Sequence, residues 1–140
     1  MSADAEVLRA RGLRVTAGRL AVLRAVADHG DHPDAGEIAL AVRGRLGSAS
    51  TQAVYDTLAT LTNVGLLRRI EPAGSSARYE TRVGDNHHHL ICRSCRRIVD
   101  VDCAAGEAPC LHPSDEHGFA IDEAEVVFWG QCDGCRAAAA

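Results

Sequence analysis

Two CxxC pairs, Cys92–Cys95 and Cys132–Cys135, constrain the fold of this chain more than any other feature of its sequence. Each CxxC turn can present two sulfurs to one ion, and four thiolates suit tetrahedral zinc. Two pairs that share an ion would clamp separate segments together and hold the C-terminal part of the chain folded. The alternative is a pair of redox-active dithiols, because WGQCDGC places an aromatic residue before the second pair, although no βαβ pattern surrounds it.

Composition indicates a globular protein that works inside the cell. The chain has 140 residues and 46% hydrophobic content, which is enough for a real core. Its first twenty residues contain no apolar run of signal-peptide length, and nothing later approaches a membrane span, so we expect a cytoplasmic location. Without an export signal, six cysteines favour metal binding or thiol chemistry over a secreted disulfide scaffold.

Charge is distributed unevenly along the chain. Residues 1–82 hold eleven Arg against nine acids, net +2, whereas residues 83–140 hold four Arg against ten acids, net −6. This asymmetry indicates that the first part meets an anionic partner and that the second part meets cations.

Four helices are predicted in the first half, each between a capping side chain and a glycine. The pairs are Asp4 with Gly12, Thr16 with Gly30, Asp34 with Gly47, and Ser50 or Thr51 with Gly65. Asp34 followed by Glu37 resembles a capping box. The apolar positions expected on the helix faces are Leu20, Leu23 and Val26, then Ile38, Val42 and Leu46, then Val54, Leu58 and Leu61.

A hairpin follows the last helix directly. Residues 66–81, LLRRIEPAGSSARYET, contain two short strand-like runs joined by a Pro/Gly/Ser turn. Short helices followed by a hairpin with basic residues are typical of a winged helix-turn-helix, which reads DNA. A small helical domain with a solvated hairpin is the alternative.

The second half is predicted to contain strands, so the fold class is α+β. Strand-like runs lie at 87–92, 96–102 and 120–132, while residues 104–118 read as a loop or a poorly formed helix. Some 55 residues cannot bury a large core, so we expect this half to depend on a metal and on self-association.

Three consecutive histidines precede the first CxxC pair. Strand alternation would place His87 and His89 on one face and His88 on the other, so the first two could ligate one ion. Nearby Glu80 and Asp100 would add oxygens, and such a mixed shell suits Fe²⁺ or Mn²⁺ as well as zinc. A solvated surface cluster is the alternative for a histidine run.

Taken together, these segments resemble the Fur (ferric uptake regulator) family of metal-dependent dimeric repressors. The resemblance covers nearly the whole chain, and its motifs in family order are GLRVT (12–16), HPDAGEI (32–38), AVYDTLATLTNVGLL (53–67), ARYE (77–80), HHHLICRSC (87–95), IVDVD (98–102) and FWGQC (128–132). RVGDNHHH and VDCAAGEAPC are similar to the actinobacterial FurA/CatR branch, whose members are peroxide-responsive repressors linked to the catalase-peroxidase gene.

The resemblance implies a winged-helix DNA-binding domain at 1–82 and an α/β dimerisation domain at 83–140. It implies a regulatory ion between them, held by His32, Glu80, His87, His89 and Asp100. Filling this site would set the two recognition helices of a homodimer to the spacing of palindromic half-sites, so that metal acts as corepressor.

The resemblance also bears on what is sensed. Peroxide-sensing relatives have Asp at position 100, where iron-sensing relatives commonly have Glu, and their bound Fe²⁺ reacts with peroxide to oxidise a ligand histidine. The family's third metal site would use positions 86 and 124, here Asn86 and Ala124, so we expect that His88, Glu107 and His117 do not form it. Cys103 and Cys110 are left unassigned and could form a peroxide-sensitive thiol pair.

The predicted recognition helix has Asp56 after Tyr55, where members of the family often have Arg. We therefore expect phosphate contacts from outside the helix and base reading by Gln52 and Tyr55. The phosphate-contact candidates are Arg14, Arg19, Arg43, Arg45, Arg68 and Arg69. The alternative for Tyr55 is a buried side chain that only packs.

A peroxide-responsive repressor is thus the leading hypothesis. The rivals are an iron- or zinc-supply sensor of the same architecture and, from another class, a CxxC thiol redox protein. The sequence contains no catalytic triad, phosphate loop or metallohydrolase motif, so an enzyme is not expected.

Overall fold

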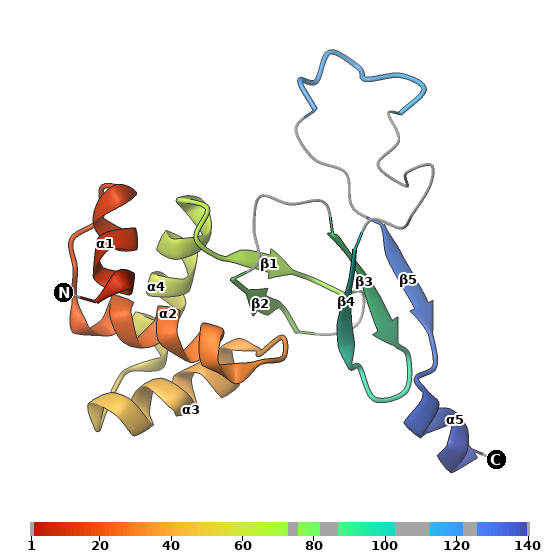
Figure 1. The fold of residues 1–140 in the computed structure, drawn as a ribbon, viewed down its shortest axis with the longest axis horizontal. Helices are drawn as coiled ribbons and strands as arrows, with labels where there is room; N and C mark the ends of the chain where they lie inside the picture. The colour runs from red at the N-terminus through yellow and green to blue at the C-terminus, as the bar shows by residue number, and fades with distance from the viewer. Residues whose placement is uncertain (1, 73–75, 82–86, 103–112, 122–125, 140) are drawn as a thin grey trace. The chain divides into compact units, whose positions relative to one another are not determined.

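The computed structural model describes residues 2–72, 76–81, 87–102, 113–121 and 126–139. The chain divides into two compact units, Met1–Val83 and Gly84–Ala140. Each unit has its own secondary structure (Figure 1). Asn86, Cys103, Glu107, Cys110 and Ala124 lie outside the described residues.

The first unit begins with four helices, α1 (Ala3–Ala10), α2 (Ala17–His29), α3 (Ala35–Leu46) and α4 (Thr51–Asn63). Three of the predicted caps are confirmed. Thr16 accepts from the N–H of Arg19 at 3.1 Å, Asp34 and Glu37 form a reciprocal capping box, and Ser50 caps α4. Side-chain oxygens here satisfy N–H groups that have no partner inside the helix.

The predicted cap of the first helix is wrong. Ser2, rather than Asp4, accepts from the N–H of Ala5 at 3.3 Å. Asp4 lies within the first turn and forms an ion pair with Arg24 of α2. Ser2, two positions before Asp4, is also a favoured capping residue type, and it takes the N-cap position.

Packing of these helices forms the core of the first unit. Leu8, Ile38, Leu58 and Leu61 are fully buried, and α2 contacts both α3 and α4. Most of the predicted apolar faces are confirmed, but Leu46 is exposed. Leu46 is the last residue of α3, where the helix runs out from the core before Gly47.

The predicted hairpin consists of β1 (Arg68–Ile70) and β2 (Arg78–Glu80), paired antiparallel. The segment between α2 and α3 joins this small sheet through an antiparallel bridge between Asp34 and Arg78. The N–H of Tyr79 also donates to the carbonyl of Pro33 at 3.0 Å. Helices followed by this hairpin form a winged helix-turn-helix.

The second unit is a three-stranded sheet with a short C-terminal helix. Its strands are β3 (His87–Cys92), β4 (Ile98–Asp102) and β5 (Val127–Gly130), in the order β4-β3-β5. β3 pairs antiparallel with β4 and parallel with β5. Helix α5 (Asp133–Ala139) was not anticipated from the sequence.

One predicted strand is shorter in the structure, and the predicted loop agrees with it where its residues are described. The strand expected over 120–132 is confined to Val127–Gly130 among its described residues. In the segment read as a loop or poor helix, residues 113–118 contain neither helix nor strand, and 104–112 lie outside the described residues. Among the described helices, none combines the length and apolar character needed to cross a bilayer.

The core of the first unit provides a direct test of the fold. Leu58→Ala should lower the free energy of unfolding by about 2–5 kcal/mol, because it leaves a cavity where a fully buried side chain was. Leu40→Ala is the control: Leu40 lies 71% exposed on α3, and its loss should change stability by less than about 0.5 kcal/mol. Urea unfolding followed by circular dichroism measures both, and equal effects would remove Leu58 from the core.

Candidate functional site

Four cysteines of the second unit converge on one point. Their sulfur atoms all lie within 4.8 Å of one another, and Cys95 Sγ is 3.8 Å from Cys132 Sγ. All four are free thiols. Cys92 ends β3, Cys132 follows β5, and Cys135 lies in α5. The arrangement can hold one metal ion with four sulfur ligands.

Strand pairing explains this convergence. The parallel register places Cys92 opposite Gly130, and the N–H of Arg93 donates to the carbonyl of Gly130 at 2.8 Å. Both CxxC turns therefore begin at the same end of the sheet, where β3 and β5 finish. Near that end, Gln131 donates to the hydroxyl of Ser94 at 3.0 Å.

The pKa values of the thiols diverge within this group. Backbone N–H groups of Cys95 and Cys132 point at Cys92 Sγ from 3.5 and 3.4 Å and lower the pKa of Cys92 to about 5. Contacts with the sulfurs of Cys132, Cys92 and Cys95 raise the pKa of Cys135 to about 12. Four thiolates so close together repel one another, so a bound cation is needed to ionise them all. This geometry favours a metal site over two independent redox dithiols.

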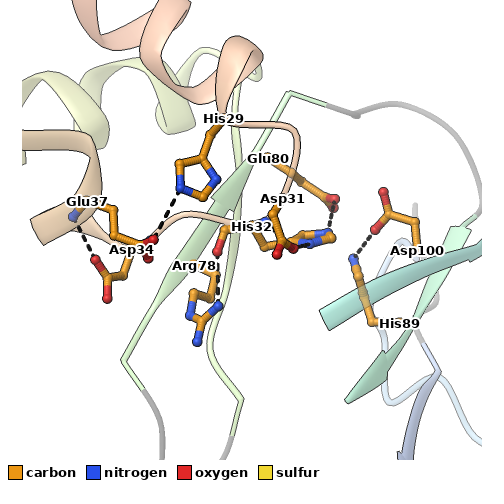
Figure 2. A network of polar contacts seen from close by, with 9 residues as sticks. All are labelled: His29, Asp31, His32, Asp34, Glu37, Arg78, Glu80, His89 and Asp100. Carbon is orange, nitrogen blue, oxygen red and sulfur yellow. Dashed lines mark hydrogen bonds and ion pairs between the residues drawn. The ribbon is translucent and has the colours of Figure 1, made fainter. Parts of the chain in front are cut away.

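A second set of candidate ligands begins with a buried pair in the first unit. His32 Nε2 lies 3.0 Å from Glu80 Oε2, and both side chains are buried (Figure 2). His32 comes from the α2–α3 connection and Glu80 from β2, which are held together by the Asp34–Arg78 bridge. A nitrogen and an oxygen donor are thus brought side by side from positions far apart in sequence.

The second unit contains a similar pair. His89 and Asp100 are direct partners in the β3–β4 register, and His89 Nε2 lies 3.2 Å from Asp100 Oδ1 (Figure 2). His89 is completely buried, whereas Asp100 is partly exposed. The pair has the same donor types as His32 and Glu80, which hard and borderline metal ions prefer.

The interpretation of the histidine run as a solvated cluster is wrong for His88 and His89, since both are buried. His88 Nδ1 accepts from the backbone N–H of Val126 at 3.0 Å, so this ring serves the packing of the sheet. His87 lies in β3 opposite Asp102, and its side chain is outside the described part. His117 is exposed, 3.5 Å from Asp115.

Asp31 was not anticipated as part of this region. Its carboxylate accepts from the backbone N–H of His32 at 2.8 Å and lies 3.4 Å from His32 Nδ1. Burial opposes ionisation of Asp31, but the contacts with His32 outweigh it and lower the pKa of the carboxyl group. An acidic residue directly before a candidate ligand histidine was the available signal.

The candidate DNA-binding residues lie on the first unit. Tyr55 is half exposed on α4, so it does not merely pack inside the core. Gln52, one turn earlier, donates through Nε2 to Asp56 Oδ1 at 2.9 Å. A groove of about 590 Å³ separates α4 from the hairpin, and its lining includes Tyr55, Asn63, Arg69 and Tyr79.

The arginines expected to contact phosphate differ in their surroundings. Arg14 is exposed, and its carbonyl accepts from Arg19 at 2.9 Å. Arg68 and Arg69 lie on β1, with Arg69 2.5 Å from Glu71. Arg43 instead donates to Ala49 and Thr51, and Arg45 pairs with Asp28 at 2.6 Å. These contacts link α3 to the start of α4 and to α2.

Comparison with known proteins gives consistent matches. The model of the ferric uptake regulator family matches residues 10–129. The chain is 60% identical to transcriptional regulator FurA of Mycobacterium tuberculosis over 131 residues, which cover 94% of this chain and 88% of that one. It is 33% identical to the peroxide-responsive repressor PerR of Staphylococcus aureus, covering 92% and 86%.

The fold is also found among solved structures. A ferric uptake regulator from Pseudomonas aeruginosa with manganese superposes with a TM-score of 0.70 at 20% identity, covering 94% of this chain and 99% of that one. At this identity the likeness concerns the fold, an N-terminal winged helix followed by an α/β domain.

Replacing one thiol tests the four-cysteine group. Cys95→Ser should reduce bound zinc from one per chain to nearly none and destabilise the second unit, because three remaining thiolates close the site poorly. Elemental analysis and thermal unfolding measure this. Ser94→Ala is the control, since Ser94 shares the turn without contributing a sulfur ligand, and it should keep its zinc. A stable Cys95→Ser protein with full zinc content would contradict the assignment.

Proposed function

Because the chain belongs to the ferric uptake regulator family, we propose that this metal-dependent transcriptional regulator is a repressor that senses peroxide through a regulatory iron site. Members of the family are transcriptional regulators and not enzymes. The observation that carries the proposal is the pair of His–carboxylate contacts, His32–Glu80 in one unit and His89–Asp100 in the other. Both pairs offer nitrogen and oxygen donors without sulfur.

The proposed regulatory ligands are His32, Glu80, His87, His89 and Asp100. This set follows from the motif positions of the family, and the two His–carboxylate pairs support it. A mixed nitrogen and oxygen shell suits Fe²⁺ or Mn²⁺. Fe²⁺ held by these residues would supply peroxide chemistry, with an oxidant formed next to the imidazoles. His32 and His89 are the described rings that would be exposed to it.

The proposed role of the four-cysteine group is structural. Sulfur ligands favour zinc, and a closed set of four leaves no position for a substrate. Cys92, Cys95, Cys132 and Cys135 would thus hold the small second unit folded while the other site responds to conditions. This division follows the different preferences of soft and hard ligands.

For DNA, residues 1–82 are the proposed binding domain. Tyr55 and Gln52 would read bases from α4, while Arg14, Arg19, Arg68 and Arg69 would contact phosphates. The half-exposed ring of Tyr55 and the net charge of +2 over 1–82 support this assignment. The target is double-stranded palindromic operator DNA in the cytoplasm, and a catalase-peroxidase gene is the proposed regulated gene.

Residues 83–140 are proposed to form a homodimer. Leu90 of β3 lies opposite Val99 of β4 and Phe128 of β5, so the three side chains form a row across one sheet face. They are 45%, 37% and 44% exposed. An apolar row of this kind suits burial against a second copy, and a dimer places two recognition helices on two half-sites.

Base reading by Tyr55 can be separated from general DNA binding. Tyr55→Ala should lose about 1–3 kcal/mol of discrimination at the affected base while keeping its affinity for random duplex. Leu40→Ala, exposed on a different helix, is the control and should bind as the wild type. Fluorescence anisotropy with operator and scrambled duplexes at several salt concentrations measures both the sequence discrimination and the affinity for random duplex. Equal weakening on the two duplexes would remove Tyr55 from base reading.

The peroxide proposal is tested on protein loaded with Fe²⁺. Mild peroxide should release operator DNA and add one oxygen atom to His32, His87 or His89, while the four zinc-binding cysteines remain reduced. Oxidation of a ligand lowers the affinity of the site for the ion. Because the bound ion favours the DNA-binding state, repression ends by a population shift. Peptide mass spectrometry and anisotropy, measured at the same times, follow the two events.

Protein loaded with Mn²⁺ is the control and should keep its DNA under the same peroxide dose. If DNA release instead followed oxidation of Cys103 and Cys110, or of the CxxC pairs, with every histidine intact, sensing would be by thiols. If neither loaded form responded to peroxide, but DNA binding was lost when the metal was removed, the protein would be a metal-supply sensor.

A further inference from the structure

Asp31, which is not one of the proposed ligands, contacts His32 at two points. The backbone N–H of His32 donates to Asp31 Oδ1 at 2.8 Å, and His32 Nδ1 lies 3.4 Å from the same oxygen. On the other side of the ring, Nε2 lies 3.0 Å from Glu80 Oε2. Each ring nitrogen of this buried histidine therefore faces a different carboxylate (Figure 2).

The chemistry of imidazole gives this arrangement a consequence. A neutral imidazole has one N–H and one lone pair, and the partner of the first nitrogen decides which nitrogen is left to bind a metal. A carboxylate that accepts from the N–H also increases the basicity of the ring and fixes its orientation. Asp31 is such a partner for Nδ1.

We propose that Asp31 is a positioning residue of the regulatory site: it accepts the Nδ1–H of His32, so that the Nε2 lone pair points at the ion that Glu80 also binds. The inference rests on the proposed function, because it assumes that His32 is a ligand. It goes further by assigning to Asp31 control over how tightly the ion is held, and thus over the metal concentration at which the regulator binds DNA.

The backbone around His32 has other contacts besides the one to Asp31. Arg78 Nη1 donates to the carbonyl of His32 at 3.1 Å, and the N–H of Tyr79 donates to the carbonyl of Pro33 at 3.0 Å. Asp34 caps α3 and bridges to Arg78. The Asp31 side chain is 57% exposed and adds little to the core. Removing it should release the ring while leaving the segment folded.

The chain contains a matched control. Asp115 accepts from the backbone N–H of His117 at 2.8 Å, and its carboxylate lies 3.5 Å from His117 Nε2. The chemistry resembles that of Asp31 and His32, but His117 is exposed and is not among the proposed ligands. Asp115→Ala removes the same charge and the same kind of contact at another place.

The experiment uses the full chain with zinc bound and Mn²⁺ as the probe, with free Mn²⁺ followed by electron paramagnetic resonance. Asp31→Ala should raise the Mn²⁺ dissociation constant about 10–100-fold. Asp31→Asn keeps an oxygen acceptor without the charge and should restore part of the affinity. Asp115→Ala should bind as the wild type. Zinc content and the thermal midpoint without Mn²⁺ should be unchanged in all three.

The outcomes distinguish the role of Asp31 from the assignment of the regulatory site itself. His32→Ala should abolish Mn²⁺ binding, and if it does not, the regulatory site itself is wrongly assigned. If His32→Ala loses Mn²⁺ while Asp31→Ala binds as the wild type, only the role of Asp31 is overturned. Equal weakening by Asp31→Ala and Asp115→Ala would reveal a general effect of charge and would also overturn it.

Discussion

Backbone pairing between strands determines where the candidate ligands of this chain lie. In the first unit, the bridge between Asp34 and Arg78 brings the α2–α3 connection against β2, and His32 meets Glu80 as a result. In the second unit, β3 pairs with β4 on one side and with β5 on the other. The first pairing sets His89 opposite Asp100, and the second brings the two CxxC turns to the same end of the sheet.

This pairing separates two kinds of metal chemistry along a single strand. Strand β3 carries His89 near its start and Cys92 at its end. Imidazole with carboxylate and a set of four thiolates select different ions, so a short sheet can serve both a structural and a regulatory purpose. A structural ion would suit the small second unit, because its apolar row is exposed and few of its described side chains are fully buried.

The segment that contains His32 also has two roles. Residues 32–37 provide a candidate ligand, a strand bridge and the capping box of α3, and Asp31 contacts the candidate ligand from the other side. Helix α3 packs on α4, the proposed reading helix. A ligand and the start of the helix-turn-helix thus share one short backbone, which is the kind of connection through which metal occupancy can bias a DNA-binding state.

Local signals in the sequence determined much of this structure. Capping residues and glycines set the limits of α2, α3 and α4, since those signals act within a few residues. The two CxxC pairs identified the four-sulfur group because two such pairs are a typical spacing of zinc ligands. The choice between Ser2 and Asp4, the exposure of Leu46 and the burial of His88 depended on packing against distant residues. So did the contacts of Asp31 and the pairing of His89 with Asp100. Register and burial are set by contacts between segments remote in sequence, so only the tertiary structure could decide them.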